Sequence, residues 1–138
     1  MVALVAALGW VVSGSMEEPI TKVGDSAPVF RVQTENGKTL TEKDFGGKLL
    51  VLNFWAAWCA PCVQEVPSLE EFQRTMADQG VVVLGVSVDT NPALYKRFRE
   101  QFNVSFETSR DPEWDLAAKY GTFQLPETYI IDRSGKVV

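Results

Sequence analysis

Two apolar segments separated by a helical pattern constrain the fold of this chain more than any other feature. Residues 48–55 (KLLVLNFW) and 81–88 (VVVLGVSV) are too short for most helices and too uniformly apolar for strands with one face in water. Between them, apolar residues recur at spacings of three and four from Pro61 to Met76, until Gly80 ends the pattern. The sequence therefore predicts two buried strands joined by a right-handed helical crossover.

Weaker patterns flank this unit. They predict a hairpin over 29–41 with an Asn36-Gly37 turn, a helix opened by Asn91-Pro92, a short strand near Phe106, a helix from about Pro112 to Tyr120 closed by Gly121, and a strand over Thr128–Ile131. This alternation of strands and helices predicts an α/β fold with helices on both faces of a sheet and an N-terminal β-hairpin. Residues 136–138 start as a strand, so we expect the natural chain, with a C-terminal strand or helix, to continue beyond Val138.

Length and composition limit the possible functions. With 138 residues, 46% hydrophobic and 22% charged, the chain suits one folded domain, which we place at residues 19–138. A net charge of −5 with scattered Lys and Arg argues against nucleic acid as a partner. Two cysteines and no histidine are too few for a tetrahedral zinc site, and Val63 stands where c-type haem attachment needs histidine, so we expect no metal.

The first 18 residues differ from the rest. Val2–Val12 is an unbroken apolar run, shorter than the roughly 20 residues that span a bilayer and similar to the centre of a signal peptide. No basic residue precedes it, and a short amphipathic or core-docked helix is the alternative. We expect residues 1–18 to be the remnant of a signal peptide or membrane anchor plus a linker, and the protein to be exported or anchored.

The two cysteines lie where the first buried strand turns into the helix. Amides and the dipole at a helix start stabilise negative charge, so Cys59 is expected to ionise readily and act as nucleophile. Cys62 lies one turn further, within disulfide reach, and is the expected resolving thiol. Pro61 suits the first helical turn. A permanent disulfide or two inert thiols is the alternative, although a bridge closing so small a loop stabilises little.

The cysteine segment, WCAPC after VLNFWAA, resembles the active site of the thioredoxin superfamily. Asn53, Glu65 and Pro67 narrow the resemblance to extracytoplasmic thioredoxin-like proteins of the TlpA, ResA and cytochrome c maturation (DsbE) type. The opening segment GDSAPVF at residues 24–30 is similar to one that this group shares with peroxiredoxins. The resemblance covers about residues 24–138 and implies a thioredoxin-like fold with a mixed β-sheet.

The resemblance also implies roles for individual residues. Glu65 would exchange a proton with Cys62, whose helix face it shares, while a solvated glutamate is the alternative. Pro126 would be the cis-proline of the family and would set the Leu125 backbone beside the disulfide, where it can bind an extended peptide; a trans proline is the alternative. We expect the substrate to contact the following residues: Trp58, Ala60, Pro61, Leu125 and Pro126.

Together these observations predict a thiol:disulfide oxidoreductase with no cofactor besides its redox-active disulfide. The resemblance implies a monomeric reductase outside the cytoplasm, with protein disulfides such as those of apocytochrome c as substrates and a membrane thiol-transfer protein as electron donor. A peroxidase is the nearest alternative, but Ala56 stands where peroxiredoxins carry threonine. A redox-inert or copper-carrying module would be another, yet such copper carriers add a histidine that is missing here.

Overall fold

The computed structural model of the chain describes residues 20–138, so the apolar segment Val2–Val12 and the predicted domain boundary lie outside the described residues. The described elements are β1 (Arg31–Gln33), β2 (Thr39–Thr41), the 3₁₀ helix η1 (Glu42–Phe45), β3 (Leu49–Trp55), α2 (Ala60–Met76), the 3₁₀ helix η2 (Ala77–Gln79), β4 (Val81–Ser87), α3 (Pro92–Gln101), β5 (Glu107–Arg110), α4 (Asp115–Tyr120) and β6 (Glu127–Ile131). In this part of the chain, no helix combines the length and apolar character needed to cross a bilayer.

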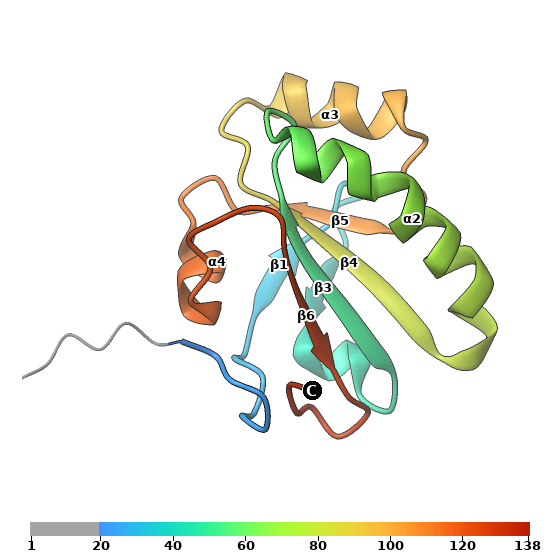
Figure 1. Cartoon of the computed structure of the whole chain (residues 1–138), viewed down its shortest axis with the longest axis vertical. Helices are drawn as coiled ribbons and strands as arrows, with labels where there is room; N and C mark the ends of the chain where they lie inside the picture. Colours follow the sequence, from blue (N-terminus) through green and yellow to red (C-terminus); the bar gives the residue numbers. More distant parts are fainter. Residues whose placement is uncertain (1–19) are drawn as a thin grey trace, which may run out of the picture.

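A four-stranded sheet in the order β5-β4-β3-β6 forms the centre of the molecule (Figure 1). β3, β4 and β5 are parallel, and β6 runs antiparallel to β3, so the sheet is mixed. Helix α2 connects β3 to β4 and completes the predicted crossover. β1 and β2 form the predicted hairpin, which joins the edge of the sheet through a bridge between Thr34 and Ser109. The α/β fold with a mixed sheet is confirmed.

Side chains of β3 alternate between the two covered faces of the sheet. Val51, Asn53 and Trp55 lie on the face covered by α2 and α3, where Asn53 bonds to α2 and Trp55 stacks on two rings of α3. Leu52 and Phe54 lie on the α4 face, where the Phe54 ring is 5.7 Å from that of Tyr120 in α4. Figure 1 shows α2 and α3 on one side of the sheet and α4 on the other. Because β3 is buried on both faces, it anchors the segment that follows it.

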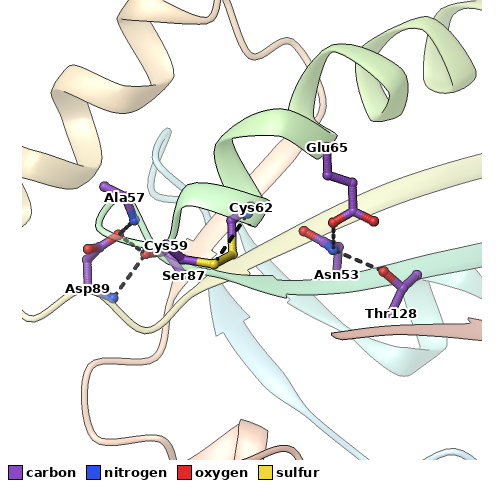
Figure 2. The surroundings of a disulfide bond; sticks show 8 residues. All are labelled: Asn53, Ala57, Cys59, Cys62, Glu65, Ser87, Asp89 and Thr128. Atoms are coloured by element: carbon purple, nitrogen blue, oxygen red, sulfur yellow. Dashed lines mark hydrogen bonds between the residues drawn. A yellow bond between two sulfur atoms is a disulfide. The ribbon is translucent and has the colours of Figure 1, made fainter. Parts of the chain in front are cut away.

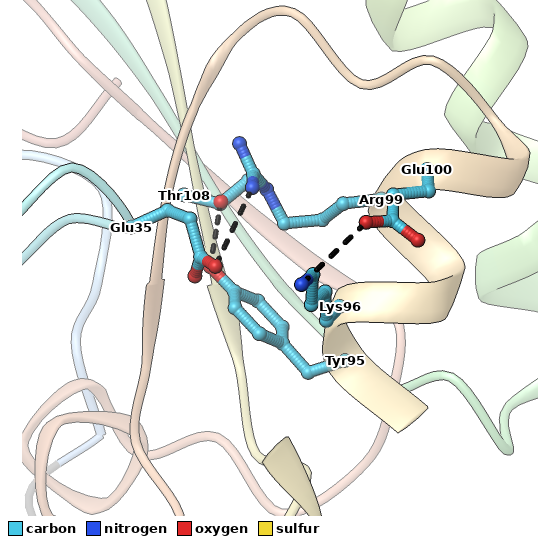
Figure 3. Close-up of polar contacts among 6 residues, drawn as sticks. All are labelled: Glu35, Tyr95, Lys96, Arg99, Glu100 and Thr108. Atoms are coloured by element: carbon cyan, nitrogen blue, oxygen red, sulfur yellow. Dashed lines mark hydrogen bonds and ion pairs between the residues drawn. The ribbon is translucent and has the colours of Figure 1, made fainter. Parts of the chain in front are cut away.

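Helix α3 is tied to the sheet and to the hairpin by a cluster of polar contacts (Figure 3). The Tyr95 hydroxyl lies 2.6 Å from the hydroxyl of Thr108 in β5, and burial raises the pKa of Tyr95. The Arg99 guanidinium lies over the Tyr95 ring, 5.9 Å from its centroid, and 3.9 Å from a carboxylate oxygen of Glu35 in the hairpin turn. The Lys96–Glu100 pair on the same helix is solvent-exposed. The cluster therefore fixes the helix on which Trp55 stacks.

The helix predicted to start near Pro112 begins three residues later, at Asp115. The Trp114 amide donates to the Asp111 carbonyl at 3.0 Å, closing a turn, and Trp114 has a φ of 61°. A left-handed residue interrupts the right-handed α conformation, so the helix starts only after it. Gly121, with a φ of 79°, closes α4 as predicted.

Candidate active site

The two cysteines are joined by a disulfide at the start of α2, with their Cα atoms 5.2 Å apart. Cys59 is the N-cap residue, with extended backbone angles, and its sulfur accepts a hydrogen bond from the Cys62 amide at 3.3 Å. Pro61 lies in the first helical turn, where its missing N–H removes no intrahelical bond. A thiolate released at Cys59 would therefore meet the Cys62 amide and the positive end of a 17-residue helix.

Access to the disulfide is unequal. Cys62 is 1% exposed and Cys59 is 6% exposed, while Ala60 and Pro61 between them face solvent. Trp58, next to Cys59, is 66% exposed, unlike Trp55, which is buried in the core as predicted. An exposed indole beside the disulfide is an apolar surface on which a polypeptide can pack.

The peptide bond between Leu125 and Pro126 is cis, as expected. Because β6 pairs with β3 so that Glu127 is opposite Phe54, Pro126 lies at the end of β3 from which the cysteine segment leaves. Leu125 and Pro126 are both half-buried. The structure thus brings the predicted substrate contacts to one edge of the sheet from two distant parts of the sequence, the β3–α2 junction and the α4–β6 loop.

Glu65 lies on the Cys62 side of the disulfide, with its carboxylate turned down onto the sheet (Figure 2). It is half-buried and accepts a hydrogen bond from the side-chain amide of Asn53 at 3.3 Å. Asn53 is 2% exposed, and the same amide nitrogen donates to the Thr128 hydroxyl at 3.0 Å. Asn53 therefore links the carboxylate above the sheet to β6.

A second carboxylate, which the motif reasoning missed, lies on the Cys59 side (Figure 2). Asp89 is 1% exposed, and its Oδ2 accepts hydrogen bonds from the Ala57 amide at 2.8 Å and the Ser87 hydroxyl at 2.6 Å. Its position could have identified it, because Asp89 follows a buried strand that runs parallel to the strand leading into the cysteines. The carboxyl ends of neighbouring parallel strands lie at the same edge of a sheet.

The fold and this site define a thioredoxin-like thiol:disulfide oxidoreductase. A buried strand leads into a CxxC pair at a helix N-terminus, and Cys59 is the more exposed residue of the pair. An apolar surface and a cis-proline loop lie beside it. Within residues 20–138 no cluster of three or more His, Cys, Asp or Glu side chains is placed to hold a metal ion.

Comparison with known proteins identifies the family. The AhpC/TSA family matches residues 23–138. The thiol-disulfide oxidoreductase ResA of Geobacillus thermodenitrificans is 34% identical over 139 residues, covering 99% of this chain and 80% of the relative. ResA of Bacillus subtilis is 31% identical over 141 residues, covering 100% of this chain and 78% of the relative. The chain belongs to the AhpC/TSA family and, within it, to the ResA-like thiol-disulfide oxidoreductases.

Solved structures agree with this assignment. The thiol:disulfide interchange protein DsbE of Chlorobium tepidum superposes with a TM-score of 0.81 and 32% identity, covering 85% of this chain and 82% of that one. A secreted disulfide oxidoreductase of Mycobacterium tuberculosis, described as homologous to DsbE of E. coli, gives a TM-score of 0.71 at 25% identity, covering 79% of this chain and 80% of that one. The predicted thioredoxin-like fold and the predicted enzyme class are confirmed.

Proposed function

We propose that this enzyme reduces disulfides of exported proteins, including apocytochrome c cysteines, outside the cytoplasm. The observation that carries the proposal is the placement of Cys59 as the N-cap of α2, with its partner Cys62 behind it. The relatives named above are thiol-disulfide oxidoreductases, and one structural relative is a secreted protein. The apolar run before residue 19 supports export or anchoring. A membrane thiol-transfer protein would return electrons to a monomeric enzyme.

Exchange begins with the reduced pair. The Cys59 thiolate attacks one sulfur of the substrate disulfide, and the other substrate sulfur leaves as a thiolate that takes up a proton. A mixed disulfide between Cys59 and the substrate results. Trp58 and the Leu125–Pro126 backbone hold the substrate chain during this step, and the amides at the start of α2 stabilise the attacking thiolate.

Resolution uses Cys62. The Cys62 thiol passes its proton to Glu65 and attacks the Cys59 sulfur, which releases the second substrate thiolate and forms the Cys59–Cys62 disulfide. Glu65 then gives its proton to the departing thiolate through solvent. Two electrons and the Cys62 proton thus pass from the enzyme to the substrate, and solvent supplies the proton that the first leaving thiolate takes up. The position of Glu65 on the Cys62 side of the disulfide supports this role (Figure 2).

The test is to trap the mixed disulfide. A Cys62→Ser variant produced in an oxidising extracytoplasmic compartment should accumulate disulfide-linked adducts with exported proteins, which mass spectrometry after non-reducing electrophoresis identifies. The Cys59→Ser variant is the matched control and should form far fewer adducts, because its remaining cysteine is buried. Absence of adducts from the Cys62→Ser variant would overturn the proposal, and equal adducts from both variants would overturn the assignment of Cys59 as nucleophile.

The proton role of Glu65 has its own test. A Glu65→Gln variant should slow resolution of a preformed mixed disulfide about tenfold or more near neutral pH. Glu71→Gln on an exposed face of the same helix is the control and should leave the rate unchanged. Stopped-flow measurement of single-turnover resolution separates the two. A Glu65→Gln rate equal to that of the control would remove Glu65 from the mechanism.

A further inference from the structure

Asp89 is a buried carboxylate that the exchange steps above do not use. It follows β4, is 1% exposed, and lies beside the segment between β3 and the first cysteine. Its Oδ2 accepts the amide of Ala57, two residues before Cys59, and the hydroxyl of Ser87. Both donors are neutral, and among residues 20–138 no cationic side chain forms an ion pair with Asp89.

The backbone around Asp89 is held from several directions. The Ser87 hydroxyl accepts from the Asp89 amide at 3.0 Å, and the Val88 amide donates to the Trp55 carbonyl at 3.0 Å. The Arg110 guanidinium donates to the carbonyls of Asp89 and Thr90 at 3.1 and 3.0 Å, so this cation binds the main chain and not the carboxylate. Asp89 is therefore a fixed acceptor, already oriented toward the turn that carries Cys59.

The location of the carboxylate matters for the sulfur chemistry. In Figure 2, Asp89 and its two donors, Ala57 and Ser87, lie on the Cys59 side of the disulfide. Asn53, Glu65 and Thr128 lie on the Cys62 side. Tyr95 of α3, which packs on Trp55, stays neutral at ordinary pH because burial raises its pKa. Within the described residues, Asp89 is thus the acidic group bonded to the backbone that leads directly into Cys59.

We propose that Asp89 is a positioning residue for thiol–disulfide exchange: it holds the Ala57 turn in place and sets a fixed negative charge beside Cys59 that lowers the reduction potential of the pair. The inference rests on the proposed reductase and extends it to the direction of electron flow. A negative charge near a thiolate disfavours the thiolate, opposing the amides and dipole of α2. Because the thiolate belongs to the reduced enzyme, disfavouring it favours the disulfide and makes the dithiol a better reductant.

The test replaces the charge and keeps the shape. In Asp89→Asn, the side-chain oxygen can still accept from Ala57, but the charge is gone. The pH midpoint for alkylation of Cys59 by iodoacetamide should fall by about half to one pH unit. In glutathione redox buffer, at a pH where Cys59 is ionised, the equilibrium should move toward the dithiol by about threefold to tenfold, where tenfold corresponds to about 30 mV.

Two further variants make the test decisive. Asp111→Asn is the matched control, because Asp111 is also buried and accepts a backbone amide at 2.9 Å, but from Ala117 of α4 on the opposite face. It should leave both readouts unchanged. Ser87→Ala keeps the Asp89 carboxylate but removes one of its two hydrogen-bond donors, which screens it from Cys59, so the pH midpoint for alkylation of Cys59 should rise. A merely structural role for Asp89 predicts no such pair of opposite shifts.

The outcomes are separable. The inference is overturned if folded Asp89→Asn keeps the wild-type pH midpoint for Cys59 alkylation and the wild-type dithiol–disulfide equilibrium. It is also overturned if Asp111→Asn shifts both readouts as much as Asp89→Asn does. If Asp89→Asn does not fold, an unchanged midpoint in Ser87→Ala overturns it instead. Both readouts use the enzyme and small thiols alone, so they are independent of adduct trapping, and failure to find an exported substrate would count against the proposed function only.

Discussion

Replacing Asn53 tests how the buried amide beneath the active site works. Its side-chain nitrogen donates both to Glu65, at 3.3 Å, and to Thr128, at 3.0 Å. Asn53→Ala removes both donors and leaves a small void, whereas Asn53→Asp keeps the shape but places a carboxylate against that of Glu65. Both variants should be less stable than wild type, and the aspartate variant should be the less stable of the two above neutral pH.

The magnitudes follow from these contacts. Two hydrogen bonds lost from a buried amide, one of them to a carboxylate, cost about 2–3 kcal/mol. Two unit charges 3.3 Å apart repel by about 5 kcal/mol at an effective dielectric constant near 20. Because Glu65 is half-exposed and can turn toward water, roughly 2–3 kcal/mol of that repulsion should remain. The free energy of unfolding should therefore fall by about 4–6 kcal/mol in Asn53→Asp and by about 2–3 kcal/mol in Asn53→Ala.

The two variants also differ in pH dependence. In folded Asn53→Asp the facing carboxyls bind one proton more tightly than in the unfolded chain, so the variant is least destabilised at low pH and loses stability as the pH rises. Urea unfolding of the oxidised protein at about pH 5 and about pH 8 measures this. The difference between the two variants should grow by about 1–2 kcal/mol over this range, because part of the repulsion is already present at about pH 5. A difference independent of pH would refute the argument.

Other predictions concern the core, the tyrosines and the cluster on α3. Gly85→Ala places a Cβ 2.9 Å from Cε2 of Phe106, so overpacking should lower the free energy of unfolding by about 1–3 kcal/mol in urea titrations. Burial raises the pKa of Tyr120 above its ordinary value of 10.0; stability should therefore fall as the pH rises above about 10, and Tyr120→Phe should flatten that decline, measured by unfolding alongside tyrosinate absorbance. Arg99→Ala should destabilise by about 1 kcal/mol, and the exposed Lys96→Ala by no more than about 0.5 kcal/mol, in parallel thermal melts.

The local part of the fold was predictable because it depends on short-range patterns. Uniform apolar runs identify the buried strands, and a helical period bounded by Gly80 identifies α2. The α-helix itself ends at Met76, and the 3₁₀ helix η2 fills the residues up to Gly80. The strand-to-helix junction placed Cys59 at a helix start, which is where the structure has it. These features rest on neighbours within a few residues. The predicted start of α4 was wrong because the Trp114 backbone adopts a left-handed conformation. Its surroundings stabilise that conformation, and the local sequence carries no reliable signal for it.

The surroundings of the two cysteines could not be predicted from the sequence alone, because they depend on how distant strands pair in the folded protein. The sequence alone indicates redox chemistry at Cys59 and Cys62, and resemblance to a family singles out Glu65 and Pro126. Only the register of the sheet brings Pro126 to the end of β3, and only the parallel alignment of β3 and β4 brings Asp89 against the turn before Cys59. The physical reason is that a hydrogen bond between residues 32 positions apart leaves no periodic trace in the chain, so its partners are defined only when the strands pack together.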